Sequence, residues 1–133
     1  MSQVTIPAAI TALGLHALQH RGQEAVGIVS YNSTSGKFHS ERALGPVGDN
    51  FSSYDTMKRL IGEMAIGHVR YSTTGETLLR NVQPLFADFA FGGLAIAHNG
   101  NITNALSLRD ELIRKGSIFQ STSDTETILQ LVA

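Results

Sequence analysis

Two strand–turn–strand units constrain the fold of this 133-residue chain more than any other feature. They lie at residues 25–43 and 86–97, the first with its turn at NSTSG (32–36) and the second joined across Gly92–Gly93. A further strand is predicted over 63–72. Hairpins pair their strands in antiparallel fashion, and the repeated βαβ units of a parallel sheet are absent. The sequence therefore predicts the α+β class, with an antiparallel sheet covered by helices.

Helical periodicity predicts four helices around these strands. Gly22 is expected to stop the first, a serine to cap the second, and Thr103 to cap the third, which ends at Gly116. The last opens with Ser123-Asp124-Thr125-Glu126, which has the form of a capping box. The predicted helices span residues 7–21, 52–60, 103–116 and 123–133.

The stretch LAIAHNGN (94–101) is typical of a strand buried on both faces that stops at Asn99. A helical pattern follows it instead of a returning strand, so the Asn-Gly turn is not a plain hairpin. The Asn99 amide and the Gly100 backbone N–H could donate two hydrogen bonds to one oxygen as it becomes anionic. Taken alone, the turn also fits a connector that needs a residue with positive φ.

Polar residues also flank two other predicted elements. Arg70, at the end of the strand over 63–72, offers a planar fork for a carboxylate, and Asp124 offers an anion for an ammonium group. With Asn99 and Gly100 for a carbonyl oxygen, these groups fit an amino acid with a side-chain amide or ester. Taken singly, Arg70 also fits a surface ion pair and Asp124 a helix cap.

Composition excludes several classes of function. The formal net charge of −1 leaves no basic stripe for nucleic acid or an anionic membrane. The absence of cysteine excludes disulfides, thiolate zinc sites and a cysteine nucleophile within these residues. His16 and His20 lack an acidic ligand nearby, and nucleotide-binding glycine motifs are absent, so neither metal nor cofactor is expected. Without a signal peptide or an 18-residue apolar run, the chain is predicted to be cytoplasmic.

Five runs of the sequence carry a resemblance to a known family. They are LHALQHRGQE (15–24), GHVRYSTTG (67–75), NVQPLF (81–86), AHNGN (97–101) and STSDTE (121–126). In order and spacing they resemble the glutaminase domain of the amidophosphoribosyltransferases, within the class II glutamine amidotransferases. RYSTTG with NVQPLF favours this member over the glucosamine-phosphate and asparagine synthetase relatives. The resemblance implies an N-terminal-nucleophile hydrolase fold, an α/β/β/α sandwich, with 1–133 as a partial domain incomplete at both ends.

The resemblance also implies roles for the residues already singled out. Arg70 would bind the α-carboxylate of glutamine, and Asp124 its α-ammonium group. Asn99 and Gly100 would form the oxyanion hole. The residues expected to shape the pocket are Tyr71, Ser72 and Thr73, and those expected to support the loop beside the nucleophile are Arg21 and Gly22.

The nucleophile of the family, a terminal cysteine that opens a CGxxG strand, does not occur in this sequence. In the family its thiol attacks the amide, with the free α-amino group as base, to give a glutamyl thioester and ammonia. The pocket is therefore expected to bind glutamine without turning it over, and the isolated chain to be inactive. Removal of Met1 would expose Ser2 as a terminal hydroxyl, but Ser2 lies closer to Arg21 than the family's cysteine does and lacks its strand.

For a full-length protein, the resemblance implies transfer of ammonia to phosphoribosyl pyrophosphate, which gives 5-phosphoribosylamine in purine biosynthesis. The implied partners are L-glutamine, a phosphoribosyltransferase domain that carries magnesium, and like subunits of a homo-oligomer. Two alternatives are a non-catalytic glutamine-binding or regulatory module and the glutaminase domain of another class II amidotransferase. A third is a fragment that folds incompletely, because loss of a central strand leaves sheet edges unpaired.

Overall fold

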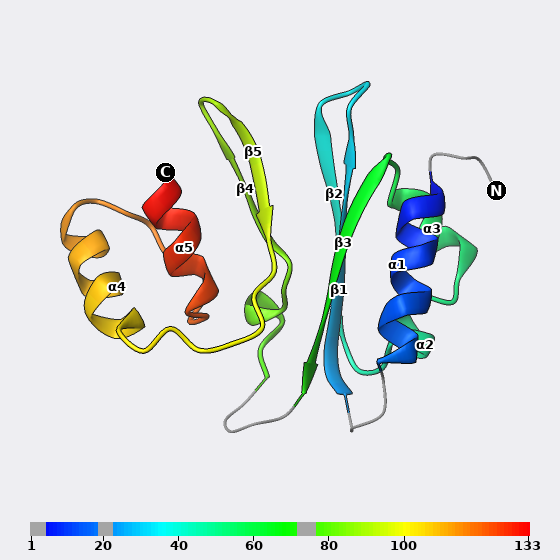
Figure 1. Cartoon of the computed structure of the whole chain (residues 1–133), viewed down its shortest axis with the longest axis horizontal. Coiled ribbons are helices and arrows are strands. Elements are labelled where there is room, and N and C mark those ends of the chain that lie inside the picture. The colour runs from blue at the N-terminus through cyan, green and yellow to red at the C-terminus, as the bar shows by residue number, and fades with distance from the viewer. Residues whose placement is uncertain (1–4, 19–22, 72–76) are drawn as a thin grey trace.

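The computed structural model of the chain describes residues 5–18, 23–71 and 77–133. Helices, a sheet, a second sheet and further helices follow one another as four layers (Figure 1). Both sheets are antiparallel. The layers and the pairing confirm the predicted α+β class and the α/β/β/α sandwich. The elements are α1 (Ile6–Ala17), β1 (Gln23–Asn32), β2 (Lys37–Leu44), α2 (Val47–Asn50), α3 (Tyr54–Arg59), β3 (Met64–Tyr71), the 3-10 turn η2 (Leu79–Asn81), β4 (Leu85–Phe89), β5 (Gly92–Ile96), α4 (Ala105–Arg114) and α5 (Thr125–Val132).

The first sheet has the strand order β2-β1-β3, and one of its faces packs on α1. A Cβ added at Gly67 in β3 would lie 2.6 Å from Cγ2 of Thr11, so α1 sits directly on the strand. Burying this apolar face between helix and sheet is the main driving force for the layer. The buried residues of this core are Ala8, Ala12, Leu15, Val26, Ile28, Val47, Phe51, Met57 and Leu60.

The opposite face of the first sheet looks toward the second sheet, β4–β5. Side chains alternate along a strand, so Met64, Ile66, His68 and Arg70 of β3 all belong to this inner face. Phe38 of β2 crosses the gap: its ring lies 6.0 Å from that of Phe86, and a Cβ at Gly93 would come within 2.2 Å of it. The missing side chain at Gly93 therefore makes room for Phe38.

The segment that leads into β4 lies against the first sheet at Gly27. A Cβ added at Gly27 would lie 2.1 Å from the carbonyl oxygen of Gln83, too close for any side chain. The guanidinium of Arg42 donates to the carbonyl oxygen of Val82 at 3.0 Å, which holds the same segment from β2. These contacts bring residues 81–83 next to the end of β3.

Two predicted helix limits are wrong. The first helix ends at Ala17 instead of near Arg21, and Arg21 and Gly22 lie outside the described residues. The second begins at Tyr54 instead of residue 52, but the predicted serine cap is confirmed: Ser53 accepts a hydrogen bond from the Thr56 N–H at 3.1 Å. The short helix α2, just before it, was not predicted.

The N-terminal ends of the last two helices also differ from the prediction. Asn104, and not Thr103, is the N-cap of α4. Ser123-Asp124-Thr125-Glu126 does not form a capping box: the buried Glu126 carboxylate accepts hydrogen bonds from the N–H groups of Gln120 and Ser121, 2.9 and 2.7 Å away. Glu126 thus ties the chain before α5 to the helix.

The turn of the second hairpin lies two residues earlier than predicted, at residues 90–91. Gly92 and Gly93 therefore lie inside β5. The strand is also not buried on both faces: Leu94, Ala95 and Ile96 are half-buried. The reason is that β5 pairs with β4 alone among the described strands. Among the described residues, no helix has the length and hydropathy needed to cross a membrane.

Candidate functional site

A mainly polar cavity of about 620 Å³ lies where β3, the segment after β5 and the segment before α5 come together. It collects all of the predicted site residues that the structure describes, although they are far apart in the sequence. Those in its lining are Arg70, Tyr71, Asn99, Gly100 and Asp124. The remaining predicted site residues, Ser72, Thr73, Arg21 and Gly22, lie outside the described residues.

Arg70 reaches the cavity from the end of β3. Its Nε atom is buried and has no hydrogen-bond partner among the residues that the structure describes. A buried donor without a partner costs about 1–3 kcal/mol, so this guanidinium is suited to receive an anion that enters the cavity. The neighbouring Tyr71 also lines the cavity, but its hydroxyl donates to the carbonyl oxygen of Leu18, just after α1.

Asp124 stands on the other wall, directly before α5, where its carboxylate does not act as a helix cap. Its Oδ2 accepts a hydrogen bond from the backbone N–H of Ile102 at 2.8 Å. This bond fixes the carboxylate beside the segment that begins at Asn99. In the described part of the chain Oδ1 accepts no hydrogen bond, so it is free to receive a cation such as an ammonium group.

Asn99 and Gly100 line the same cavity and are exposed. A Cβ on Gly100 would lie 2.9 Å from Nε2 of His98, so the imidazole fills the place of a side chain there. Glycine leaves the backbone open to a ligand oxygen, which is what hydrogen-bond donation from this turn requires.

The cavity is also lined by polar residues that were not predicted as site residues from the sequence. Asn81 and Thr122 bind each other twice: the Asn81 amide donates to the Thr122 hydroxyl at 2.8 Å, and the Thr122 N–H donates to Oδ1 of Asn81 at 2.9 Å. Oε1 of Gln83 accepts from the N–H of His98 at 2.6 Å. These bonds join the segment before β4 to His98, just before the Asn99–Gly100 turn, and to the segment before α5. The only signal for them in the sequence was that they fall within three of the five runs noted above.

His68 lines the cavity two residues before Arg70, on the same face of β3. Burial lowers its pKa from the ordinary value of a histidine, and the positive charge of Arg70 acts in the same direction. The nearby backbone of His98 acts in the opposite direction. His68 is therefore neutral at pH 7.

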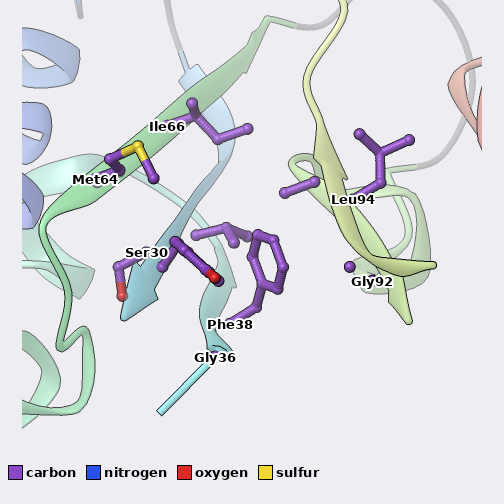
Figure 2. Close-up of a pocket in the computed structure, with 12 residues that line it drawn as sticks. Ser30, Gly36, Phe38, Met64, Ile66, Gly92 and Leu94 are labelled. Atoms are coloured by element: carbon purple, nitrogen blue, oxygen red, sulfur yellow. The ribbon is translucent and has the colours of Figure 1, made fainter. Parts of the chain in front are cut away.

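A second cavity, of about 510 Å³, lies further along the same gap between the sheets (Figure 2). Phe38, Met64, Ile66 and Leu94 contribute to its lining, and no charged side chain does. Ser30 and Tyr31 contribute polar side chains to its lining, which is otherwise mainly apolar. Among residues 5–18, 23–71 and 77–133, no group of three His, Asp or Glu side chains lies close enough to hold a metal ion.

Comparison with known proteins agrees with this geometry. A family model described as a glutamine amidotransferase domain matches residues 51–133, more than half of the chain. The chain belongs to this family. The matched residues of the glutamine amidotransferase domain include Arg70, the Asn99–Gly100 turn and Asp124, so the whole set of facing polar groups lies inside it.

The curated relatives of this glutamine amidotransferase domain include amidophosphoribosyltransferases. The Rhizobium etli protein is 61% identical over 95% of this chain, which spans 25% of that relative. The Lacticaseibacillus casei protein is 51% identical over 94% of the chain and 63% of the relative. A solved structure titled as the allosteric regulatory enzyme of purine biosynthesis matches 93% of the chain, with 44% identity and a TM-score of 0.83, and the chain covers 26% of it. The predicted resemblance is confirmed, and the chain spans about a quarter of two of these three proteins.

Proposed function

We propose that this chain is the glutamine-binding part of an amidophosphoribosyltransferase, and that the cavity between Arg70 and Asp124 holds L-glutamine. The supporting observation is that one cavity collects a guanidinium, a carboxylate and the Asn99–Gly100 donors. Arg70 binds the α-carboxylate, Asp124 binds the α-ammonium group, and the turn receives the side-chain carbonyl oxygen. Each group of the amino acid then meets a partner of opposite charge or matching hydrogen-bonding character.

In this proposal the turn does more than bind. When a nucleophile attacks the side-chain amide, the carbonyl oxygen becomes anionic, and donors already in place stabilise it more than they stabilise the neutral substrate. The thiol comes from outside these residues, because the chain contains no cysteine. The ammonia released passes to phosphoribosyl pyrophosphate in the phosphoribosyltransferase part of a longer, homo-oligomeric and cytoplasmic protein, the part in which magnesium belongs.

Isothermal titration of the chain tests the binding site one ligand group at a time. The ligands are L-glutamine, 4-aminobutanamide, which lacks the α-carboxylate, and glutaramic acid, which lacks the α-amino group. A hydrogen-bonded contact with a charged group contributes about 1.5–3 kcal/mol, so each deletion is expected to weaken binding at least tenfold. L-Glutamine that binds no more tightly than its two truncated analogues would contradict the proposal.

Two variants assign the contacts. Arg70→Ala is expected to bind L-glutamine and 4-aminobutanamide equally weakly, because the partner of the carboxylate is gone. Asp124→Asn keeps the size of the side chain and is expected to erase the difference between L-glutamine and glutaramic acid. Arg114→Ala is the matched control, since Arg114 is exposed on α4 and lies outside the lining of the cavity.

The absence of cysteine from the sequence also favours a second candidate function, a glutamine-binding module that does not hydrolyse its ligand. Ammonia release separates the two. The proposal expects no release by this chain alone and release by the longer protein of which it forms part. A longer protein that binds L-glutamine without releasing ammonia would favour the binding module.

A further inference from the structure

The Asn99–Gly100 turn is held on both sides by side-chain acceptors from other parts of the chain. Before the turn, Oε1 of Gln83 accepts the His98 N–H at 2.6 Å. After it, Oδ2 of Asp124 accepts the Ile102 N–H at 2.8 Å. Asp124 is assigned to the α-ammonium group of the ligand, whereas Gln83 has no part in the proposed ligand contacts. The bond to Gln83 therefore needs an explanation of its own.

The backbone around Gln83 is anchored to the first sheet. Its carbonyl oxygen lies so close to Gly27 of β1 that an added Cβ would come within 2.1 Å of it. Directly before it, the carbonyl oxygen of Val82 accepts a hydrogen bond from the Arg42 guanidinium of β2 at 3.0 Å. Val82 and Pro84, the two neighbours of Gln83 in the chain, are fully buried. Buried backbone that is closely packed moves little, so the Gln83 side chain starts from a fixed point.

His98 connects this anchored segment to the turn. Its backbone leads directly into Asn99, and its imidazole lies against Gly100, where an added Cβ would be 2.9 Å from Nε2. Gln83 thus fixes the chain that enters the turn together with the residue whose ring lies beside it. Among the described strands β5 pairs with β4 alone, so no backbone ladder to the first sheet holds this part of the chain. The bond between Gln83 and His98 supplies such a link through a side chain.

We propose that Gln83 is a positioning residue that holds the Asn99–Gly100 turn where the donors of the turn meet the side-chain carbonyl oxygen of the amino acid. This inference rests on the proposed function and adds a residue to it. Donors that are already in place bind a ligand oxygen more strongly, because donors that must be ordered during binding cost conformational entropy. Without the acceptor at position 83, the cavity still binds the α-groups but loses most of its preference for a ligand with a side-chain carbonyl.

Three substitutions of Gln83 provide a matched test. Gln83→Glu keeps an oxygen at the same reach, so the bond with the His98 N–H is kept. Gln83→Met keeps the length of the side chain without an oxygen, and Gln83→Asn keeps the amide but is one methylene too short to reach. Either of the latter two suffices if the other does not fold. Gln83→Glu also lacks the side-chain NH₂ group, so a direct contact of that group with the ligand would be lost in this variant too.

The measurement is the ratio of the dissociation constants of L-norvaline and L-glutamine, obtained by isothermal titration of the 133-residue chain. L-Norvaline has the same α-groups and ends in a methyl group where L-glutamine has its amide. An added charge acts on the α-groups that both ligands share, so its effect cancels in the ratio. We expect Gln83→Met and Gln83→Asn to lower the ratio about tenfold, the contribution of two neutral hydrogen bonds, and Gln83→Glu to keep it within about twofold.

Two results would overturn positioning by Gln83. The first is an unchanged ratio in the variants that lack the acceptor, because a merely structural role weakens both ligands equally. The second is an equal fall of the ratio in Gln83→Glu, which would mean that the amide NH₂ group of Gln83 contacts the ligand directly.

Backbone ¹⁵N relaxation of the ligand-free chain separates this proposal from the proposed function. The order parameter of the Gly100 N–H is expected to fall in Gln83→Met and to stay unchanged in Gln83→Glu, while that of the Val26 N–H in the core of β1 is the same in all chains. If the original chain does not bind L-glutamine, the proposed function fails. Positioning of the turn by Gln83 then stands if the Gly100 order parameter falls in Gln83→Met, and it fails if that value is unchanged.

Discussion

The two ends of β3 carry side chains on the same inner face but serve different purposes. Met64 and Ile66 line the apolar cavity, where side chains of both sheets meet without charges. His68 and Arg70 line the polar cavity, where Nδ1 of His68 and Nε of Arg70 are buried without a hydrogen-bond partner in the described part of the chain. Apolar contacts stabilise the fold wherever they form, whereas an unsatisfied donor lowers its stability until a ligand binds. One strand therefore joins a region that stabilises the fold to a region that keeps donors free for a ligand.

The largest effect is expected at the boundary between the two ends. Gly27 pairs with His68 across the first sheet, and a Cβ there would lie 2.1 Å from the carbonyl oxygen of Gln83. Gly27→Ala is expected to lower the free energy of unfolding by about 3 kcal/mol, because backbone and not a flexible side chain must move. Urea unfolding followed by circular dichroism measures this.

Gly14→Ala in α1 is the matched control for Gly27→Ala. A Cβ at Gly14 meets nothing within 4 Å, and alanine is favoured over glycine inside a helix by about 0.5–1 kcal/mol. The same substitution is thus expected to stabilise one site and destabilise the other. A Gly27→Ala chain as stable as the original would show that the segment before β4 is not held against β1.

At the apolar end, Phe38→Ala tests whether the region contributes to stability alone. The Phe38 ring lies 4.9 Å from that of Tyr31 and 6.0 Å from that of Phe86, and it is half-buried. We expect the free energy of unfolding to fall by about 2 kcal/mol, less than for a fully buried phenylalanine. Titration should give an L-glutamine affinity within about twofold of that of the original chain. A tenfold loss of affinity would show that the two ends of β3 belong to one binding site.

At the polar end, Arg70→Met is expected to act in the opposite sense. Methionine keeps much of the length of the side chain and removes a buried donor that has no partner. Without that penalty, the free energy of unfolding is expected to rise by about 1 kcal/mol while glutamine binding is lost. Thermal unfolding and titration of the same sample measure both. A fall in stability would mean that Arg70 holds the fold together, and the contrast between the two ends would disappear.

The sequence predicted the sheet elements better than their limits. The apolar run over residues 25–31 and the NSTSG turn located β1 and β2 closely, because an apolar run and turn chemistry are local properties of the sequence. Gly92 and Gly93 were misinterpreted as a turn, since a glycine needed for space and a glycine needed for a turn look alike in sequence. The contact that explains Gly93 is with Phe38, 55 positions earlier, and no local pattern shows it.

The candidate site shows the same difference between features that local sequence predicts and contacts between residues distant in sequence. Arg70, Asn99 and Asp124 were predicted from the chemistry that each side chain offers, and the structure places all three around one cavity. The residues that hold them in place were not predicted, because their partners are distant in sequence: Gln83 binds His98, and Asp124 binds the N–H of Ile102. Such supporting bonds need the relative placement of the two sheets, which the chemistry of single residues does not give.

The smallest predicted effect concerns the stability of the polar end at low pH. Burial, helped by the positive charge of Arg70, lowers the pKa of His68 in the folded chain below its value of about 6.5 in the unfolded chain. Asp124 is the negatively charged side chain in the lining of the same cavity. Above pH 6.5 His68 is neutral in both states. Below it the unfolded chain binds more protons, so the free energy of unfolding falls until the lower, folded-state pKa is passed.

His68→Gln isolates this contribution, because glutamine does not titrate while every other histidine remains. Urea midpoints at pH 7.5 and pH 5.5 are compared for both chains. The original is expected to lose more stability on acidification than His68→Gln. An equal loss in the two chains would mean that His68 titrates as it does in the unfolded chain. Protonation of His68 at the polar end would then cost no more free energy than protonation in water. The nitrogen atoms of this end would therefore not be isolated from solvent. Isolation from solvent is the property that distinguishes this end of β3 as a ligand site.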